Sequence, residues 1–292
     1  MTINNVKTLV EAELAGYSQF STWRKAPTQT TAATYWFDLA MSPGNPSPNY
    51  YASAPNVSVA LSRSENGGLN HGGNVSPSKK FLTEFCALGT TPATVVPLPM
   101  MLCDYLMYYP FVDMSVMDFQ DLDNQATITR YTDGEGVQIM AVVVAPPLGS
   151  GNPRFQVRYT NSDGVTDRLT RWVATGTQTV NGTIISSGSP ITNTNVSTVG
   201  PFLPLEPGDK GVRSIEQVNF IDVDVGLVTF VLVKPLASFQ LREITAAVET
   251  NFLMHKGVLP QIEDDAYLNL ICCPAGTLAA GQIHGYLKTV WS

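Results

Sequence analysis

The sequence has few charged side chains: Asp, Glu, Lys and Arg together make up 14% of its 292 residues, against about 25% in ordinary soluble domains. A monomer keeps a charged surface that holds it dispersed in water. Charge is costly to bury in an interface unless it is paired. The shortage of charge therefore favours a subunit whose surface is covered by neighbouring chains.

Basic residues are scarcer than acidic ones, with 17 Lys and Arg against 24 Asp and Glu and a net charge of -7 at pH 7. A face that binds a phosphate backbone needs a stripe of Lys and Arg. The densest basic clusters here are short, at Arg24-Lys25 and between Arg168 and Arg171. Direct nucleic-acid binding is therefore not expected.

Residues that carry out chemistry are also few. The chain has four cysteines and three histidines, at Cys86, Cys103, Cys272, Cys273, His71, His255 and His284. Their spacing fits neither a zinc site nor a disulfide framework, so we expect buried free thiols. The HExxH, GxSxG and phosphate-loop motifs are missing as well. The sequence predicts a protein that is not an enzyme and holds no cofactor, metal or small-molecule ligand.

The longest apolar stretch, Met100 to Val112, is interrupted by Asp104 and contains Pro110. It is shorter than the roughly 20 residues that span a bilayer. The first residues, Met1 to Lys7, lack the basic and apolar regions of a signal peptide. We therefore expect a soluble protein that does not contact a membrane and is made in a reducing cytoplasm.

The N-terminal segment has the pattern of a short amphipathic helix. Apolar residues recur at helical spacing from Val6 to Leu14, Asn5 can cap the first turn, and Gly16 ends the run. Residues 17–57 then combine Pro-rich turn sequence with aromatic side chains, a composition that suits an extended segment. We interpret residues 1–57 as a helix and an extended arm. The arm either wraps a partner or packs on its own domain.

Residues 58–292 are predicted to form a β-rich core domain. The expected strands are 137–144, 154–160, 169–174, 215–223, 227–233, 266–272 and 283–291. Turn residues at 161–164 and 224–226 predict two hairpins. Apolar spacing over residues 78–89 predicts a small helical insertion. Short strands separated by turns favour an antiparallel β-sandwich or jelly-roll-like domain.

Four acidic residues cluster in the middle of the chain, at Asp113, Asp118, Asp121 and Asp123. Oxygen-rich loops bind Ca²⁺, but this run lacks the central Gly and terminal Glu of a standard calcium loop. Paired carboxylates also serve glycoside hydrolysis. A solvated acidic turn is the third alternative.

Several stretches resemble virion structural proteins of tailed bacteriophages. The resemblance lies in residues 20–27, 36–51, 159–165, 208–214 and 285–291. Within such particles the chain is similar to capsid cement or decoration proteins and to minor capsid proteins. The resemblance implies a non-catalytic subunit that packs against itself, often as a trimer, and against a major capsid protein. It also implies assembly in the host bacterial cytoplasm and residence in the virion.

Aromatic residues and Arg commonly anchor interfaces, so the candidate contacts are Trp23, Arg24, Trp36, Tyr50 and Tyr51. Replacing Trp23 and Trp36 with Ala is expected to weaken assembly without unfolding the β domain. Three other functions stay open. They are a tail or neck component, a carbohydrate-binding or glycan-cleaving β domain that uses Asp121, and the major capsid protein itself, which the shortage of long helices disfavours.

Overall fold

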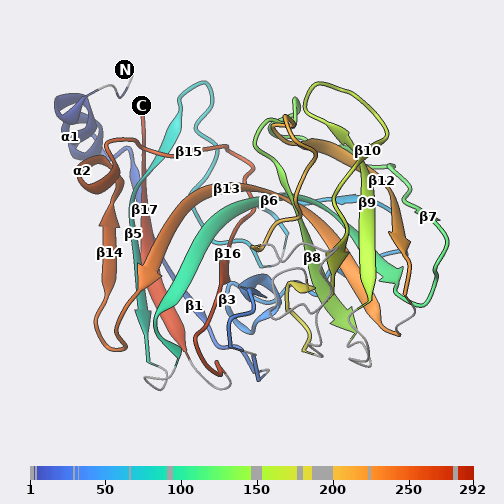
Figure 1. Cartoon of the computed structure of the whole chain (residues 1–292). Helices are drawn as coiled ribbons and strands as arrows, with labels where there is room; N and C mark the ends of the chain where they lie inside the picture. Colours follow the sequence, from blue (N-terminus) through green and yellow to red (C-terminus); the bar gives the residue numbers. More distant parts are fainter. Residues whose placement is uncertain are drawn as a thin grey trace.

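The chain folds into a mainly β protein with three antiparallel sheets and a short N-terminal helix, as the sequence predicted (Figure 1). The computed structural model describes all residues except 1, 2, 4, 29, 32, 66, 91–94, 146–152, 176–179, 186–199, 223–224 and 279–281. We name the three sheets the terminal, central and distal sheets.

Each sheet joins strands that lie far apart in the sequence. The terminal sheet has the order β14 (Val248–Asn251), β5 (Lys80–Gly89), β17 (Ile283–Trp291), β1 (Ser18–Lys25) and β3 (Gly44–Asn45), with β15 (Gln261–Ile262) on β5. The central sheet has the order β2 (Phe37–Asp38), β16 (Leu268–Cys272), β6 (Leu98–Asp113), β13 (Leu227–Leu241) and β8 (Gln138–Ala145), with β4 (Val59–Ala60) on β6. The distal sheet has the order β10 (Arg168–Leu169), β9 (Arg154–Asn161), β12 (Val212–Phe220) and β7 (Gln120–Asp121), with β11 (Val173–Ala174) on β9. The helices are α1 (Val6–Leu14), the 3₁₀ turn η1 (Leu39–Met41) and α2 (Phe252–Lys256).

The two longest strands, β6 and β13, form the arch in the middle of Figure 1. They pair along their whole length, with register shifts at three places, near Val228, Val233 and Pro235. Such bulges bend a strand and increase its twist, and they accommodate Pro235, which lacks an N–H for the ladder. The terminal sheet therefore packs against one end of the bent pair, and the distal sheet packs against the other end.

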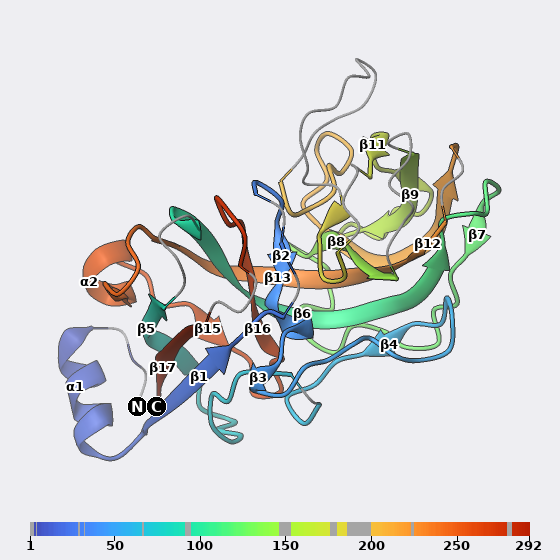
Figure 2. The same cartoon turned by 90° about the horizontal axis from the view of Figure 1, so that it is seen from below.

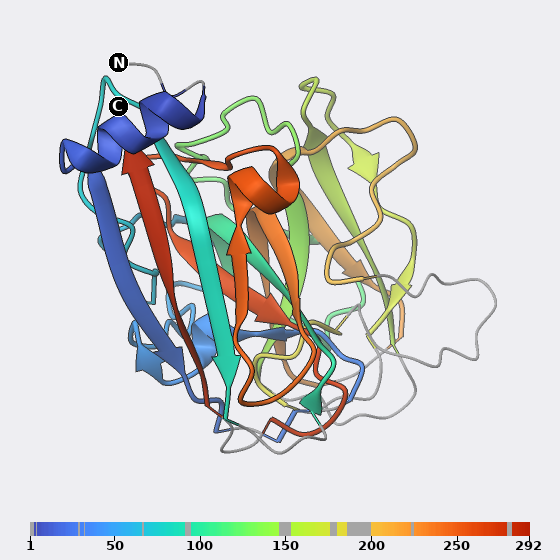
Figure 3. The ribbon, with the colours of Figure 1, turned by 90° about the vertical axis from the view of Figure 1, so that its left-hand side faces the viewer.

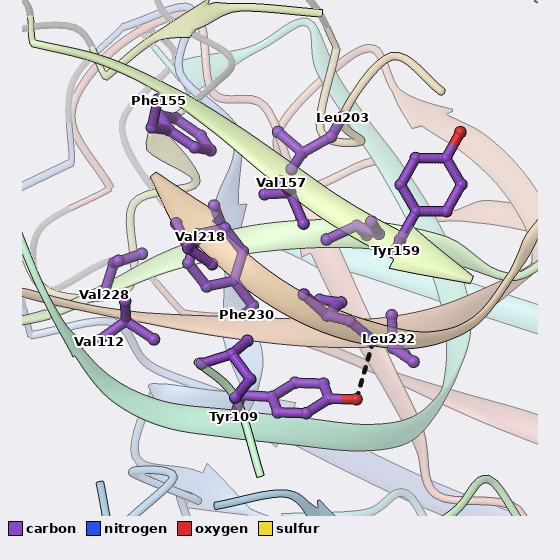
Figure 4. Close-up of a cluster of buried hydrophobic side chains, with 14 of the residues drawn as sticks. Tyr109, Val112, Phe155, Val157, Tyr159, Leu203, Val218, Val228, Phe230 and Leu232 are labelled. Atoms are coloured by element: carbon purple, nitrogen blue, oxygen red, sulfur yellow. Dashed lines mark hydrogen bonds between the residues drawn. The ribbon is translucent and has the colours of Figure 1, made fainter. Parts of the chain in front are cut away.

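Three apolar clusters follow from this arrangement. One lies between the distal sheet and the β8 half of the central sheet, and includes Phe155, Val157 and Phe230 (Figure 4). A second lies between the terminal sheet and the β16 half, and includes Phe85. The third includes Tyr105 and covers the other face of the central sheet. The central sheet is thus buried on both faces.

The predicted helix over residues 78–89 is wrong, because this segment forms strand β5. β5 lies between β17 on one side and β14 and β15 on the other. Side chains are buried on both of its faces, which gives an apolar run without clean alternation. Periodicity alone does not separate such a strand from a short buried helix.

One of the two predicted hairpins is present. β9 and β10 pair around residues 161–164, with Tyr159 opposite Arg168. The hairpin across residues 224–226 is wrong, because β12 pairs with β9 and β7 whereas β13 pairs with β6 and β8. Consecutive strands here change sheets instead of folding back on each other.

The segment interpreted as an arm lies against its own chain. β1 is an integral strand of the terminal sheet, and residues 37–41 and Tyr51 are buried on the central sheet. Of the two alternatives left open for the arm, the structure shows packing on its own domain for these residues. The described residues between Ala26 and Tyr51 form two-residue strands and one 3₁₀ turn, in keeping with the Pro-rich sequence of this segment.

A buried histidine connects a loop to the terminal sheet. His71 is fully enclosed, and its Nε2 lies 2.8 Å from the carbonyl oxygen of Ala266. Its Nδ1 lies 3.2 Å from the Nζ of Lys80, which also donates to the Gly73 carbonyl at 2.7 Å. A neutral ring fits both contacts, with Nε2–H donating to Ala266 and Nδ1 accepting from Lys80. Burial, and then the charge of Lys80, lower the pKa of His71 to about 4.

This contact predicts a loss of stability in mild acid. Between pH 6.5 and 4 the unfolded chain binds a proton at His71 and the folded chain does not. The free energy of unfolding should therefore fall as the pH is lowered through this window, by about 3 kcal/mol in total from this residue. Urea unfolding at pH 7, 5.5 and 4 measures the slope. His71→Gln should flatten it relative to the matched control His284→Gln, and parallel slopes for the two variants would contradict the assignment.

Candidate interaction surface

Exposed apolar side chains gather where the chain begins. Val6, Val10 and Leu14 of α1 are 56%, 49% and 84% exposed, and Tyr17 and Phe20 that follow are also exposed. α1 lies across the end of β1, β17 and β5, close to both termini (Figures 2 and 3). We call these five side chains the α1 surface.

The orientation of α1 explains why its apolar stripe is outside. Asn5 caps the helix by accepting from the Thr8 N–H at 3.0 Å. Glu13 pairs with Lys288 of β17 at 2.7 Å, and Ala12 is the buried residue of the helix. Val6, Val10 and Leu14 are spaced four residues apart and so share one side of the helix. An amphipathic helix usually buries its apolar side, whereas this stripe points away from the chain.

A strand edge lies next to the α1 surface. β1 pairs with β17 over its whole length, but on its other side it pairs with β3 only at Arg24 and Lys25. Within the described part of the chain, no strand covers the edge from Ser18 to Trp23, which we call the β1 edge. This stretch contains neither charge nor proline, the features that commonly protect a sheet edge from pairing with another chain.

Two of the predicted contact residues are inside the protein. Trp23 is 2% exposed and stacks on Phe85 with ring centroids 5.6 Å apart. Gly285 of β17 lies opposite it, where a side chain would collide with the Cys86 backbone and crowd the Trp23 ring. Tyr51 is wholly buried and its hydroxyl donates to Asp38. In this fold Trp23 and Tyr51 are core residues that stabilise the folded chain.

Asp38 is the centre of a buried polar cluster. Its carboxylate also accepts from the Tyr105 hydroxyl at 2.8 Å and from the Ala40 N–H at 2.9 Å. Burial raises the pKa of Asp38 despite these bonds. Nearby Lys25 donates to the Ser42 carbonyl, and burial lowers the pKa of its ammonium group to about 8. These bonds attach the irregular segment after β1 to the central sheet.

The other three predicted residues reach the surface. Arg24 and Tyr50 are exposed, and Arg24 extends from the outer face of β1. Trp36 is half-buried and lines a cleft of about 800 Å³, together with Met101 and Phe239. Arg242, Glu243 and Lys256 also line this cleft, between β13 and α2.

The acidic residues of the middle segment do not converge. Asp113 accepts from Ser115, and Asp121 accepts from the side-chain amide of Gln217 at 2.6 Å. Asp123 accepts from Gln125 at 2.7 Å. Among the residues that the structure describes, no group of three His, Cys, Asp or Glu side chains is arranged to hold a metal ion. The described helices are also too short or too polar to cross a bilayer.

The outward side of α1 and the open edge of β1 distinguish this surface, and neither was predicted from the sequence. Apolar spacing predicted α1 but did not decide whether its apolar side faces the rest of the chain or the outside. The sequence signal for the outward orientation was a second stripe, Val6, Val10 and Leu14, beside the docked residue Ala12. The open edge depends on the pairing of β1 with the distant strand β17, which strand patterns do not reveal.

Comparisons with known proteins identify no relative by sequence: no family model and no curated protein matches the chain. Among solved structures it is weakly similar to that of the infectious bursal disease virus Gt strain, with 9% identity, 94% of this chain and 80% of the other covered, and a TM-score of 0.19. The VP2 subviral particle of the same virus gives 9% identity, the same coverage and a TM-score of 0.17. TM-scores this low do not establish a common fold.

The placement of Trp23 changes the expected effect of its removal. Trp23→Ala should lower the free energy of unfolding by about 3–5 kcal/mol, because it leaves a large cavity against Phe85. Tyr50→Ala is the matched control, because its ring is 56% exposed, and should change stability by less than about 0.5 kcal/mol. Urea denaturation measures both variants. Equal, small losses would show that Trp23 lies at the surface.

Proposed function

We propose that this chain is a non-catalytic structural subunit of a virus particle, specifically a cement or minor capsid protein of a tailed bacteriophage. It works by packing against copies of itself and against a major capsid protein. The observation that carries the proposal is that an outward apolar helix stripe lies beside an uncovered, uncharged strand edge. Both belong to a chain with only 14% charged residues.

These two features are costly for a solitary protein. An open edge presents unpaired N–H and C=O groups to any passing strand, and a contiguous apolar patch marks an interaction surface. Within a particle, neighbouring subunits bury both. The sequence resemblance to phage virion proteins supports a tailed bacteriophage as the proposed type of particle. A trimer is the proposed oligomer, and a tail or neck component would use the same kind of surface.

The carbohydrate-directed alternative has less support. Three of its four acidic residues, Asp113, Asp121 and Asp123, accept hydrogen bonds from neighbouring side chains. The exposed aromatic ring in that region, Phe119, is covered by the guanidinium of Arg158 at 4.7 Å from the ring centroid. No described feature favours a glycan groove there over a solvated acidic turn.

Self-association of the purified chain tests the proposal directly. Light scattering during size-exclusion chromatography should give a mass of several copies. The double variant Val10→Lys, Leu14→Lys should weaken association by about tenfold or more, because burying two added charges is unfavourable. Its stability should change by less than about 0.5 kcal/mol, since both side chains are exposed. The matched control is Val165→Lys, which alters an equally exposed residue in the β9–β10 loop.

Location in a particle is the second test. Mass spectrometry of purified virions from the virus that encodes this chain should detect it at a fixed copy number. Particles assembled without it should rupture at a lower temperature than complete particles. A chain that stays monomeric at every concentration and is missing from those virions would contradict the proposal.

A further inference from the structure

We infer that the β1 edge binds the β1 edge of a second copy of this chain, so that two terminal sheets join across a two-fold axis at Phe20. The inference rests on the proposed self-association and adds a two-fold contact to it, through which two copies, or two of the proposed trimers, join. A two-fold contact uses the same patch on both copies, so the edge must be complementary to itself.

The hydrogen-bonding groups of the edge have the required alternation. The Trp291 N–H donates to the Tyr17 carbonyl at 3.0 Å, which fixes the phase of the β1–β17 ladder. In an antiparallel ladder alternate residues bond to the same neighbour. The peptide groups of Ser18, Phe20 and Thr22 therefore point to the open side. A second extended strand, whose alternate residues also point their N–H and C=O groups sideways, can form hydrogen bonds with these peptide groups.

Two side-chain amides already bond to backbone carbonyls on the open side of β1. The Gln19 Nε2 donates to the Phe20 carbonyl at 3.0 Å, and the Asn45 Nδ2 donates to the Thr22 carbonyl at 3.5 Å. Both carbonyls thus accept from flexible side chains where a sheet would supply backbone N–H groups. A second strand replaces these bonds with a regular ladder.

The neighbouring structure limits the register. β3 occupies the edge beside Arg24 and Lys25, so a second strand has to end before Arg24. At the other end Gly16, with φ +78, turns the chain away from the sheet into α1. The two-fold register that fills the free stretch places Phe20 opposite Phe20 of the second copy, and Ser18 opposite its Thr22.

Aromatic packing supports the same register. The Phe20 ring already packs on Tyr286 of β17, with centroids 4.8 Å apart. Phe20 is nevertheless 56% exposed. Facing strands of one sheet bring opposite side chains within contact distance. The two Phe20 rings therefore complete an aromatic row between the Tyr286 rings of the two copies.

Charge explains why the occupant is a second copy. The stretch Ser18 to Trp23 is uncharged, so two copies do not repel each other there. Arg24 lies opposite Gly16 of the second copy in this register, next to the end of its α1. The last turn of α1, which the structure describes in full, contains no basic residue. A helix C-terminus carries partial negative charge, so each Arg24 meets the negative end of its neighbour's helix.

α1 and Arg24 lie on the same face of the terminal sheet, as a contact between Arg24 and the neighbour's α1 requires. Lys288 is the partner of Phe20 in the β17 register and binds Glu13 of α1. α1 therefore lies on the face from which Phe20 and Arg24 extend. In a continuous antiparallel sheet the two copies present the same face to the same side. A strand from an unrelated protein would satisfy the backbone but would not bring α1 to Arg24.

Cross-linking tests the two-fold axis. Phe20→Cys should form a disulfide-linked dimer under mild oxidation. Opposite residues in a hydrogen-bonded pair have Cα atoms about 5.5 Å apart, within the disulfide range of about 4.4–6.8 Å. The matched control is Tyr50→Cys, which is equally exposed but lies off the edge and should stay uncross-linked on non-reducing gels. Cys86, Cys103 and Cys272 are buried, and the half-buried Cys273 is present in both variants, so the control accounts for it.

Removing one edge N–H tests the ladder. Thr22→Pro deletes a donor that β17 does not use, a change that edge strands tolerate. It should weaken association by about tenfold or more, whereas Thr22→Ala, which keeps the N–H, should associate like the wild type. Circular dichroism confirms that both variants are folded. Arg24→Glu should weaken association in the same direction.

The outcomes separate this inference from the proposed function. Dimers, or hexamers where a three-fold contact is also present, support the two-fold edge. A wild type that associates, with no Phe20→Cys cross-link and with Thr22→Pro equal to Thr22→Ala, overturns the edge contact and leaves the proposed function standing. A mass of only three copies also overturns it. A monomeric wild type whose incorporation into particles depends on the Thr22 N–H assigns the edge to a strand of another protein and likewise overturns the inference.

Discussion

The pairing of β6 with β13 is the constraint on which the rest of the structure depends. Both strands are long and apolar, and the central sheet that they form is buried on both faces. Every backbone N–H and C=O in such a place needs a partner, and the ladder between the two strands supplies most of them. Because the β6–β13 pair bends at its bulges, the terminal sheet packs on one end of the central sheet and the distal sheet packs on the other end. The terminal sheet, and with it the β1 edge and the α1 surface, is positioned by packing on the β16 end of this pair.

A buried ion pair fixes the middle of β6. The Arg130 guanidinium donates to both carboxylate oxygens of Asp104, at 2.8 and 2.9 Å. It also donates to the carbonyls of Leu61 and Tyr105. Burial raises the pKa of Asp104, and the Arg130 guanidinium opposes that rise. A buried pair of this kind adds little net stability over apolar packing, but loss of one partner is costly. Its consequence here is geometric, because it ties the loop before β8 and the strand β4 region to one point of the arch.

The sequence was sufficient for elements whose neighbours along the chain determine their structure. α1, β8, β17 and the β9–β10 hairpin were predicted, because a cap, an apolar run or a turn marks each of them locally. The helix expected at residues 78–89 and the hairpin across 224–226 failed, since β5 and β13 take their partners from distant segments. The same limit applies to the candidate site. Trp23 has the composition of an interface anchor, but its position opposite Gly285 makes it a core residue, and only the register of β1 with β17 decides between the two.

The distribution of charge strengthens the case for an assembly subunit. Part of the small set of charged side chains is enclosed: Lys25, Asp38, Lys80, Asp104 and Arg130 are all buried. These five side chains do not contribute charge to the outer surface. Solvated monomers need dispersed surface charge, and these five residues instead stabilise irregular segments and the central arch from within. A chain that places charge inside and leaves an apolar helix stripe and a bare strand edge outside is suited to an environment in which other protein surfaces, rather than water, meet its exterior.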